Sequence, residues 1–180
     1  MGIMLYYDLF RKGGICLDIR KILLPVDGSE CRINFLKVVE EIALKFKAEI
    51  TVLNVQHKYP QPIHSAATLE KYGLSKTVLD QDERNKRSIG IVNQMRNLLS
   101  QKGIRAQTRV ETGNPPERII EIAESENFDL IIMCSHGIEA NKRFLMGSTT
   151  NKVLHYSKKP VLVVKHEFCK VIDFESMRKR

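Results

Sequence analysis

The stretch that decides the fold is Leu130-Ile131-Ile132-Met133-Cys134-Ser135-His136-Gly137. Its first four residues are all apolar, without the alternation of apolar and polar side chains that marks a strand with one exposed face. A short continuous apolar run is typical of a strand in a parallel sheet, because helices cover such a sheet on both faces. Two further runs have the same character, Ile22-Leu23-Leu24 and Val161-Leu162-Val163-Val164. The three runs together predict an α/β protein with a parallel sheet.

Apolar segments rich in β-branched residues predict the strands of this sheet. There are five of them: Lys21 to Val26, Glu49 to Val55, Ala106 to Thr112, Phe128 to Ser135 and Pro160 to Lys165. Segments with helical periodicity lie between them. Because crossovers between parallel strands are right-handed and carry a covering helix, this alternation predicts a three-layer α/β/α sandwich around a five-stranded parallel sheet.

Two of the predicted helices precede the third strand. The first has Ser29 as its expected N-cap and one apolar stripe, formed by Phe35, Leu36, Val39, Ile42, Ala43 and Phe46. The second is expected from about Asp80 to Gln101, with an acidic first turn and a basic remainder that suit the helix dipole. A long connection, His57 to Val78, leads into it.

Two more helices are predicted in the C-terminal half. Asn114 is the expected N-cap of one, because Pro115 at the first helical position and Glu117 at the third follow it. The other runs from Ser148 to Tyr156, before Pro160 opens the last strand.

Length and composition predict one domain. The chain has 180 residues, of which 43% are hydrophobic and 28% charged, and this balance excludes collagen-like and wholly disordered proteins. We expect a domain over residues 20–166, an N-terminal extension over 1–19 and a basic C-terminal tail over 167–180.

Cysteine usage and hydropathy indicate the compartment. The four cysteines form no CxxC pair, so neither a metal site nor a secreted disulfide framework is expected, and we expect a reducing, cytoplasmic setting. The apolar runs are far shorter than the roughly 18 residues that a membrane helix needs, so no membrane association is expected.

The net charge of +8 is concentrated in one region. Between Arg84 and Arg109 there are seven basic residues and no acidic one. This run lacks the interleaved aromatic residues of nucleic-acid-binding motifs, so we interpret it as an exposed helix face and expect no nucleic-acid partner.

The most informative chemistry follows the fourth predicted strand. Nine residues separate Gly137 from Gly147-Ser148-Thr149-Thr150, which open the last helix. Glycines let backbone amides approach a ligand, and the start of a helix offers unpaired N–H groups with partial positive charge. The segment therefore predicts an anion site that suits a phosphate chain. It is neither a Walker loop nor a dinucleotide fingerprint, since their lysine and GxGxxG are absent.

These residues resemble the universal stress protein family, whose signature is G-x-x-G, nine residues, then G-[S/T]. Here Cys134-Ser135-His136-Gly137 and Gly147-Ser148 match it, except that Cys134 replaces the first glycine. Further matches, in register over Arg20 to Lys165, are Lys21 to Glu30 at the first strand, Thr112-Gly113-Asn114-Pro115, and Lys159 to Val164. The resemblance implies a universal stress protein domain of the adenine nucleotide alpha hydrolase-like fold.

The resemblance also implies an ATP site. The adenine and ribose would be held by Pro25, Val26, Asp27 and Val55, with Met133 near the base. The phosphates would be held by Gly137, Gly147, Ser148, Thr149 and Thr150, and Cys134 and His136 complete the nucleotide-binding set. Two roles are open for Asp27: accepting hydrogen bonds from the nucleotide, or helping to place a magnesium ion.

Three functions are compatible with this resemblance. The first is a dimeric ATP-binding stress-response regulator without robust catalysis, its subunits pairing through Pro160 to Lys165 as the family implies. The second is a nucleotide-free dimerising module, which would follow if the Cys134 side chain closes the phosphate loop. The third is a slow ATP hydrolase or adenylyl-type transferase that uses His136, for which fold alone is weak support.

Overall fold

The computed structural model describes residues 18–28, 33–57, 76–135 and 146–164. Its five strands are β1 (Lys21–Pro25), β2 (Glu49–Gln56), β3 (Ala106–Thr112), β4 (Leu130–Cys134) and β5 (Val161–Val164). Its helices are α1 (Ile33–Phe46), α3 (Lys76–Ser100), α4 (Pro115–Ser125) and α5 (Ser148–Tyr156). The predicted alternation of strands and helices is confirmed.

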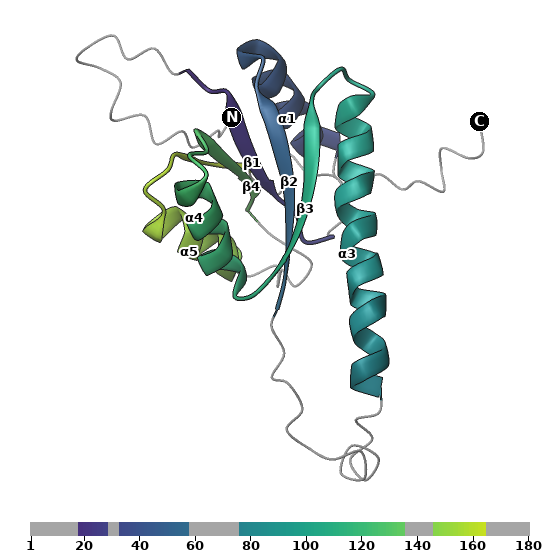
Figure 1. The fold of residues 1–180 in the computed structure, drawn as a ribbon. Helices are drawn as coiled ribbons and strands as arrows, with labels where there is room; N and C mark the ends of the chain where they lie inside the picture. Colours follow the sequence, from purple (N-terminus) through teal and green to yellow (C-terminus); the bar gives the residue numbers. More distant parts are fainter. Residues whose placement is uncertain (1–17, 29–32, 58–75, 136–145, 165–180) are drawn as a thin grey trace.

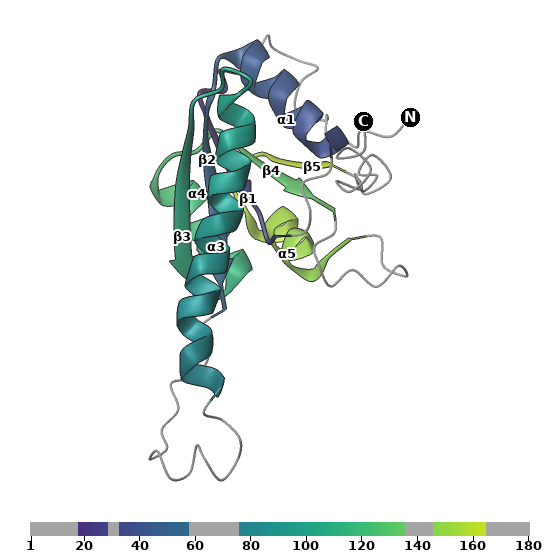
Figure 2. The same cartoon turned by 90° about the vertical axis from the view of Figure 1, so that its right-hand side faces the viewer.

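The strands form one parallel sheet in the order β3-β2-β1-β4-β5. Figure 1 shows α4 and α5 on one side of this sheet and α3 on the other, and Figure 2 shows α1 on the same side as α3. The predicted three-layer α/β/α sandwich is therefore confirmed.

Each face of the sheet has its own apolar core, and successive residues of a strand contribute to opposite faces. Ile22 and Leu24 of β1 pack with α1 and α3, while Leu23 packs with α4 and α5. All three side chains are fully buried. Burial on both faces is the reason that β1 and β4 are apolar without alternation.

Most predicted boundaries lie within one residue of those observed, and the larger differences concern the start of the fourth strand and the start of the second helix. The strand predicted from Phe128 begins at Leu130, because Phe128 is buried in the core without being part of the strand pairing. The second helix begins at Lys76, so its predicted acidic first turn is wrong: the first turn contains no acidic residue. Asn114 is the N-cap as predicted, but its side chain accepts no capping hydrogen bond from the backbone of the first turn; its Nδ2 instead donates to Oε1 of Glu117 (2.6 Å). Ser29 lies outside the described residues.

The carboxylate of Asp129 joins β1 to β4 at the amino ends of these strands. Its Oδ2 accepts hydrogen bonds from the backbone N–H groups of Arg20 (2.9 Å) and Lys21 (2.8 Å). The N–H of Asp129 in turn donates to the carbonyl of Lys21 (2.9 Å). The two strands are thus held together where they begin.

Candidate functional site

The strand order fixes where a ligand site is expected. From β1 the chain continues to β2 and β3 on one side, and then to β4 and β5 on the other. The order therefore reverses between β1 and β4. In open α/β sheets, ligands bind outside the carboxyl ends of the strands at such a switch point. Here the switch point is flanked by Pro25, the last residue of β1, with Val26 to Gly28 after it, and by Cys134 and Ser135 at the end of β4.

The pairing of β1 with β4 stops before either strand ends. It consists of Ile22 with Leu130 and Leu23 with Ile131. By contrast, β1 pairs with β2 as far as Pro25, and β4 pairs with β5 as far as Cys134. The carboxyl ends of β1 and β4 are therefore each held from the outer side, and not by each other.

The end of β1 is held by two hydrogen bonds to β2. The N–H of Val26 donates to the carbonyl of Leu53 (2.8 Å), which continues the strand pairing by one residue. The carbonyl of Val26 accepts a hydrogen bond from Nδ2 of Asn54 (2.7 Å), whose side chain is buried. Asn54 was not among the predicted site residues, although a polar residue inside the apolar run of β2 is a signal that points to it.

The chain turns away from the sheet directly after this point. Asp27 is exposed, and Gly28 has a φ of 82°, in the left-handed region that favours glycine. The turn thus places Asp27, an exposed residue, at the switch point.

Cys134, at the first signature position, is an ordinary strand residue. It is the last residue of β4, and its side chain packs partly buried against the core on the α1 and α3 face. The residues with positive φ in the described part of the chain do not include it. This position therefore does not require glycine for its backbone conformation.

The start of α5 is fixed to the end of β4. The N–H of Gly147 donates to the carbonyl of Ser135 (2.7 Å), and the hydroxyl of Thr150 donates to the carbonyl of Cys134 (2.9 Å). Thr150 is buried, whereas Ser148 is exposed and Thr149 is partly buried. The first turn of α5, with its unpaired N–H groups, is therefore held at the switch point.

The predicted site residues differ in how the structure places them. The residues at or beside the switch point are Pro25, Val26, Asp27, Cys134, Gly147, Ser148, Thr149 and Thr150. Val55 and Met133 belong to the core on the α4 and α5 face, with Met133 buried and Val55 partly buried. His136 and Gly137 lie outside the described residues.

A group of charged side chains near the carboxyl end of β3 joins this strand to α4. Glu111 accepts hydrogen bonds from Arg109 (2.7 Å) and Arg118 (2.8 Å). These bonds, with the stronger effect from Arg109, hold the pKa of the Glu111 carboxyl below its ordinary value. Arg109 is also paired with Glu126, and Arg118 with Glu121. Both guanidinium groups are therefore paired with carboxylates of the fold itself.

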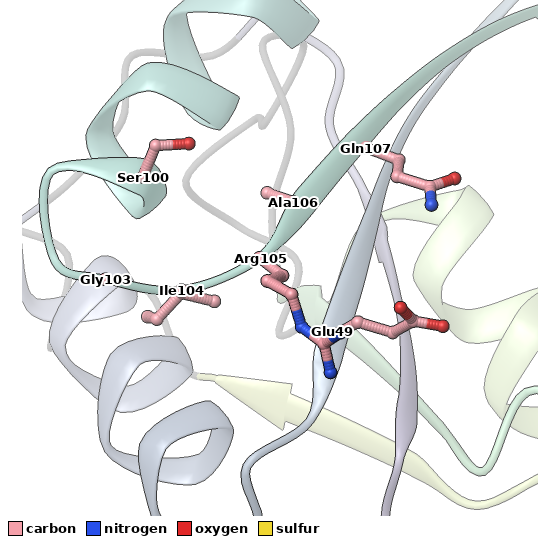
Figure 3. A pocket seen from close by; sticks show the side chains of 7 residues that line it. All are labelled: Glu49, Ser100, Gly103, Ile104, Arg105, Ala106 and Gln107. Carbon is pink, nitrogen blue, oxygen red and sulfur yellow. The ribbon is translucent and has the colours of Figure 1, made fainter.

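A pocket at the amino ends of the strands, opposite the switch point, does not belong to this site. It lies at the starts of β2 and β3 and is lined by Glu49, Ser100, Gly103, Ile104, Arg105, Ala106 and Gln107 (Figure 3). Over the described ranges, no three or more His, Cys, Asp or Glu side chains are grouped to hold a metal ion. Nor does any helix in those ranges have the length and apolarity to cross a membrane.

Comparison with known proteins identifies relatives over most of the chain. The universal stress protein family model matches residues 18–165. Universal stress protein MJ0577 of Methanocaldococcus jannaschii is 35% identical over 155 residues, which cover 82% of this chain and 96% of the relative. Universal stress protein YxiE of Bacillus subtilis is 26% identical over 147 residues, covering 81% and 98%.

Solved structures agree with this result. The structure of MJ0577 superimposes with a TM-score of 0.63 at 28% identity, covering 82% of this chain and 96% of that one. A universal stress protein in complex with cAMP gives a TM-score of 0.57 at 20% identity, covering 82% and 97%. The universal stress protein from Archaeoglobus fulgidus in complex with dAMP gives 0.53 at 18% identity, covering 82% and 99%. The last two similarities show a shared fold.

Proposed function

Because the chain belongs to the universal stress protein family, we propose that it binds ATP at the switch point between β1 and β4 and acts as a dimeric, non-catalytic stress-response regulator. Two structural neighbours are complexes with adenine nucleotides, cAMP and dAMP, which supports a nucleotide as the ligand class for this fold. We expect the protein to work in the cytoplasm.

The observation that carries this proposal is the fixed position of the first turn of α5. Gly147 and Thr150 join it to the end of β4, beside the place where the pairing of β1 with β4 has stopped. The N–H groups of that turn have no acceptor within the helix and, with the Ser148 and Thr149 hydroxyls, suit the phosphates. On the other side, Pro25, Val26 and Asp27 suit the base and ribose, and we expect Asp27 either to accept hydrogen bonds from the nucleotide or to help place a magnesium ion.

The conformation of Cys134 supports ATP binding over a nucleotide-free module. A side chain at this position would oppose binding if the backbone needed a positive φ or if the side chain occupied the phosphate site. Instead the residue continues β4, and its side chain packs against the core. A small apolar side chain of this kind is tolerated there.

We propose that the dimer forms through Pro160 to Lys165. β5 is an edge strand of the described sheet. The carbonyls of Pro160 and Val164 accept hydrogen bonds from Ile131 and Ser135 of the β4 side. Since N–H groups alternate in direction along a parallel strand, the N–H of Val163 is directed to the open edge, where a second strand can pair.

Thermal unfolding with and without magnesium and ATP tests the nucleotide site, with GTP as the control. Saturation at about 100 times Kd stabilises a protein by about 2.7 kcal/mol, which corresponds to roughly 5 to 10 °C for a domain of this size. We expect a rise of that order that is selective for ATP. No shift at millimolar ATP, once co-purified nucleotide is excluded, would favour the nucleotide-free module. Product formation over hours would instead favour a hydrolase.

A further inference from the structure

Two buried polar side chains lie at the ends of the strands that flank the switch point. Asn54 is 6% exposed and Thr150 is 5% exposed. Each donates a hydrogen bond to a backbone carbonyl at a strand end: Asn54 to Val26 at 2.7 Å, and Thr150 to Cys134 at 2.9 Å. The two residues come from different elements, β2 and α5, but they have the same relation to the backbone.

The bond from Asn54 holds a carbonyl that the sheet itself does not pair. The register of β1 with β2 ends at Pro25 and Leu53, so the Val26 carbonyl lies one residue beyond it. An unpaired buried amide or carbonyl is costly, and the contact satisfies both groups. It also fixes the peptide from which Asp27 and Gly28 continue.

The bond from Thr150 has the corresponding effect on α5. Thr150 lies in the first turn of this helix, and Cys134 is the last residue of β4. Together with the bond from Gly147 to Ser135, it fixes the helix start on the strand end at two points. The hydroxyl that makes this contact is buried, whereas that of Ser148 belongs to an exposed residue.

We propose that Asn54 and Thr150 are positioning residues, one for each half of the nucleotide. Asn54 holds the segment Val26 to Gly28 on the base and ribose side, and Thr150 holds the start of α5 on the phosphate side. This rests on the proposed function. It gives Thr150 a role different from that of a direct phosphate ligand: it places Ser148 and Thr149.

Two substitutions test the proposal. Each removes one side-chain hydrogen-bond donor and keeps the size of the side chain similar. They are Asn54→Leu and Thr150→Val, compared with Thr150→Ser, which keeps the hydroxyl, and with Thr108→Val on β3 as a control away from the switch point. Binding of ATP and of adenosine is measured by calorimetry for each variant. Adenosine has the base and ribose but no phosphate, so it reports on one half of the site.

The expected pattern is a split between the two ligands. Asn54→Leu weakens both ATP and adenosine by about three- to tenfold, which is the range for losing one hydrogen bond. Thr150→Val weakens ATP by a similar factor and leaves adenosine unchanged, while Thr150→Ser and Thr108→Val bind both ligands as wild type does. A purely structural role would not separate ATP from adenosine. Equal losses for both ligands in Thr150→Val, or unchanged binding in Asn54→Leu, would overturn the proposal.

Amide hydrogen exchange without nucleotide separates this inference from the proposed function. The N–H of Val26 should exchange about three- to tenfold faster in Asn54→Leu, and that of Gly147 in Thr150→Val, with global stability compared at the most protected amides. If wild type binds no nucleotide, the proposed function fails, and the exchange data still decide whether the two side chains hold these segments. Unchanged exchange at both amides would refute the inference even if ATP binds.

Discussion

Cys134 lies opposite Val164 in the parallel register of β4 with β5, so the residue at the first signature position is part of the sheet. We therefore expect Cys134→Gly to keep its ATP affinity within about threefold of wild type. Stability should fall by about 1 kcal/mol, because glycine in a strand costs backbone entropy and the side-chain packing is lost. Calorimetry and denaturant unfolding measure the two effects. Binding that appears only in the variant would mean that the cysteine closes the site.

A negative charge at Ser148 should separate ligand binding from folding. Ser148 is the exposed first residue of α5, where a carboxylate interacts favourably with the helix dipole. Ser148→Asp is therefore expected to fold with unchanged or slightly higher stability while losing ATP by repulsion of the phosphates. Gly147→Val should block the same site sterically. It should still fold, because the φ of −67° at Gly147 is one that other residues adopt. ATP titrations of folded variants check this, and wild-type affinity in both would refute the phosphate assignment.

Gly113 has a close neighbour in Arg118. A Cβ at position 113 would lie 2.7 Å from Cγ of Arg118, and the φ of +156° is one that side chains rarely adopt. We expect Gly113→Ala to destabilise the protein by roughly 1 to 2 kcal/mol, through strain and displacement of the arginine. Gly90→Ala is the matched control, because a Cβ there meets nothing within 4 Å in the middle of α3, and it should stabilise by about 0.5 to 1 kcal/mol. Denaturant midpoints measure both, and equal effects would contradict the steric argument.

The Glu111 carboxyl should make stability depend on pH in the acid range. The pKa of this carboxyl in the folded protein is lowered by Arg109 and Arg118. Its contribution to the free energy of unfolding is therefore complete at pH values above the ordinary pKa that Glu111 has in the unfolded chain. That contribution disappears as the pH falls through the lower, folded-state pKa. Melting temperatures of wild type and Glu111→Gln should therefore differ at neutral pH and converge in strong acid. A difference that stays constant across this range would show that the ion pairs do not stabilise the fold.

The open edge of β5 should be the place where subunits pair. Val163→Pro removes an N–H that is directed to this edge and leaves the bonds of Pro160 and Val164 with the β4 side intact. We expect the variant to sediment as a monomer under conditions in which wild type sediments as a dimer. Thr108→Pro on β3, the other edge strand, is the control for the effect of proline in an edge strand. A Val163→Pro dimer would place the interface elsewhere.

The elements that were predicted best have strong local signals. The strand Ala106 to Thr112 and the helix Ser148 to Tyr156 are observed with the predicted bounds, because glycine, proline and helix-start residues delimit them. The predicted start of α3 is wrong because this helix is only weakly amphipathic, so the pattern of apolar residues does not mark where it begins. The predicted start of the fourth strand at Phe128 is wrong because an apolar residue indicates burial, and burial does not require that its backbone pairs with a neighbouring strand.

The site could be predicted only in part. The motif at Gly147 and the turn after Val26 are local patterns, and both lie at the switch point. The order of the strands is not encoded in any local pattern, so the early end of the pairing between β1 and β4 was visible only in the structure. The contact of Asn54 could not be predicted for the same reason: its partner, Val26, directly follows another strand and lies 28 positions away.

The short pairing of β1 with β4 also has a consequence for the way the protein opens. Within the sheet, two residue pairs and the hydrogen bonds of Asp129 with the backbone of Arg20 and Lys21 join the three strands β3, β2 and β1 to the two strands β4 and β5. Sub-global unfolding separates a protein where few bonds cross between cooperative units. We therefore expect a boundary between two such units to coincide with the proposed nucleotide site. A ligand that contacts both sides of that boundary would couple the two units. Its binding should therefore increase the cooperativity of unfolding as well as the free energy of unfolding.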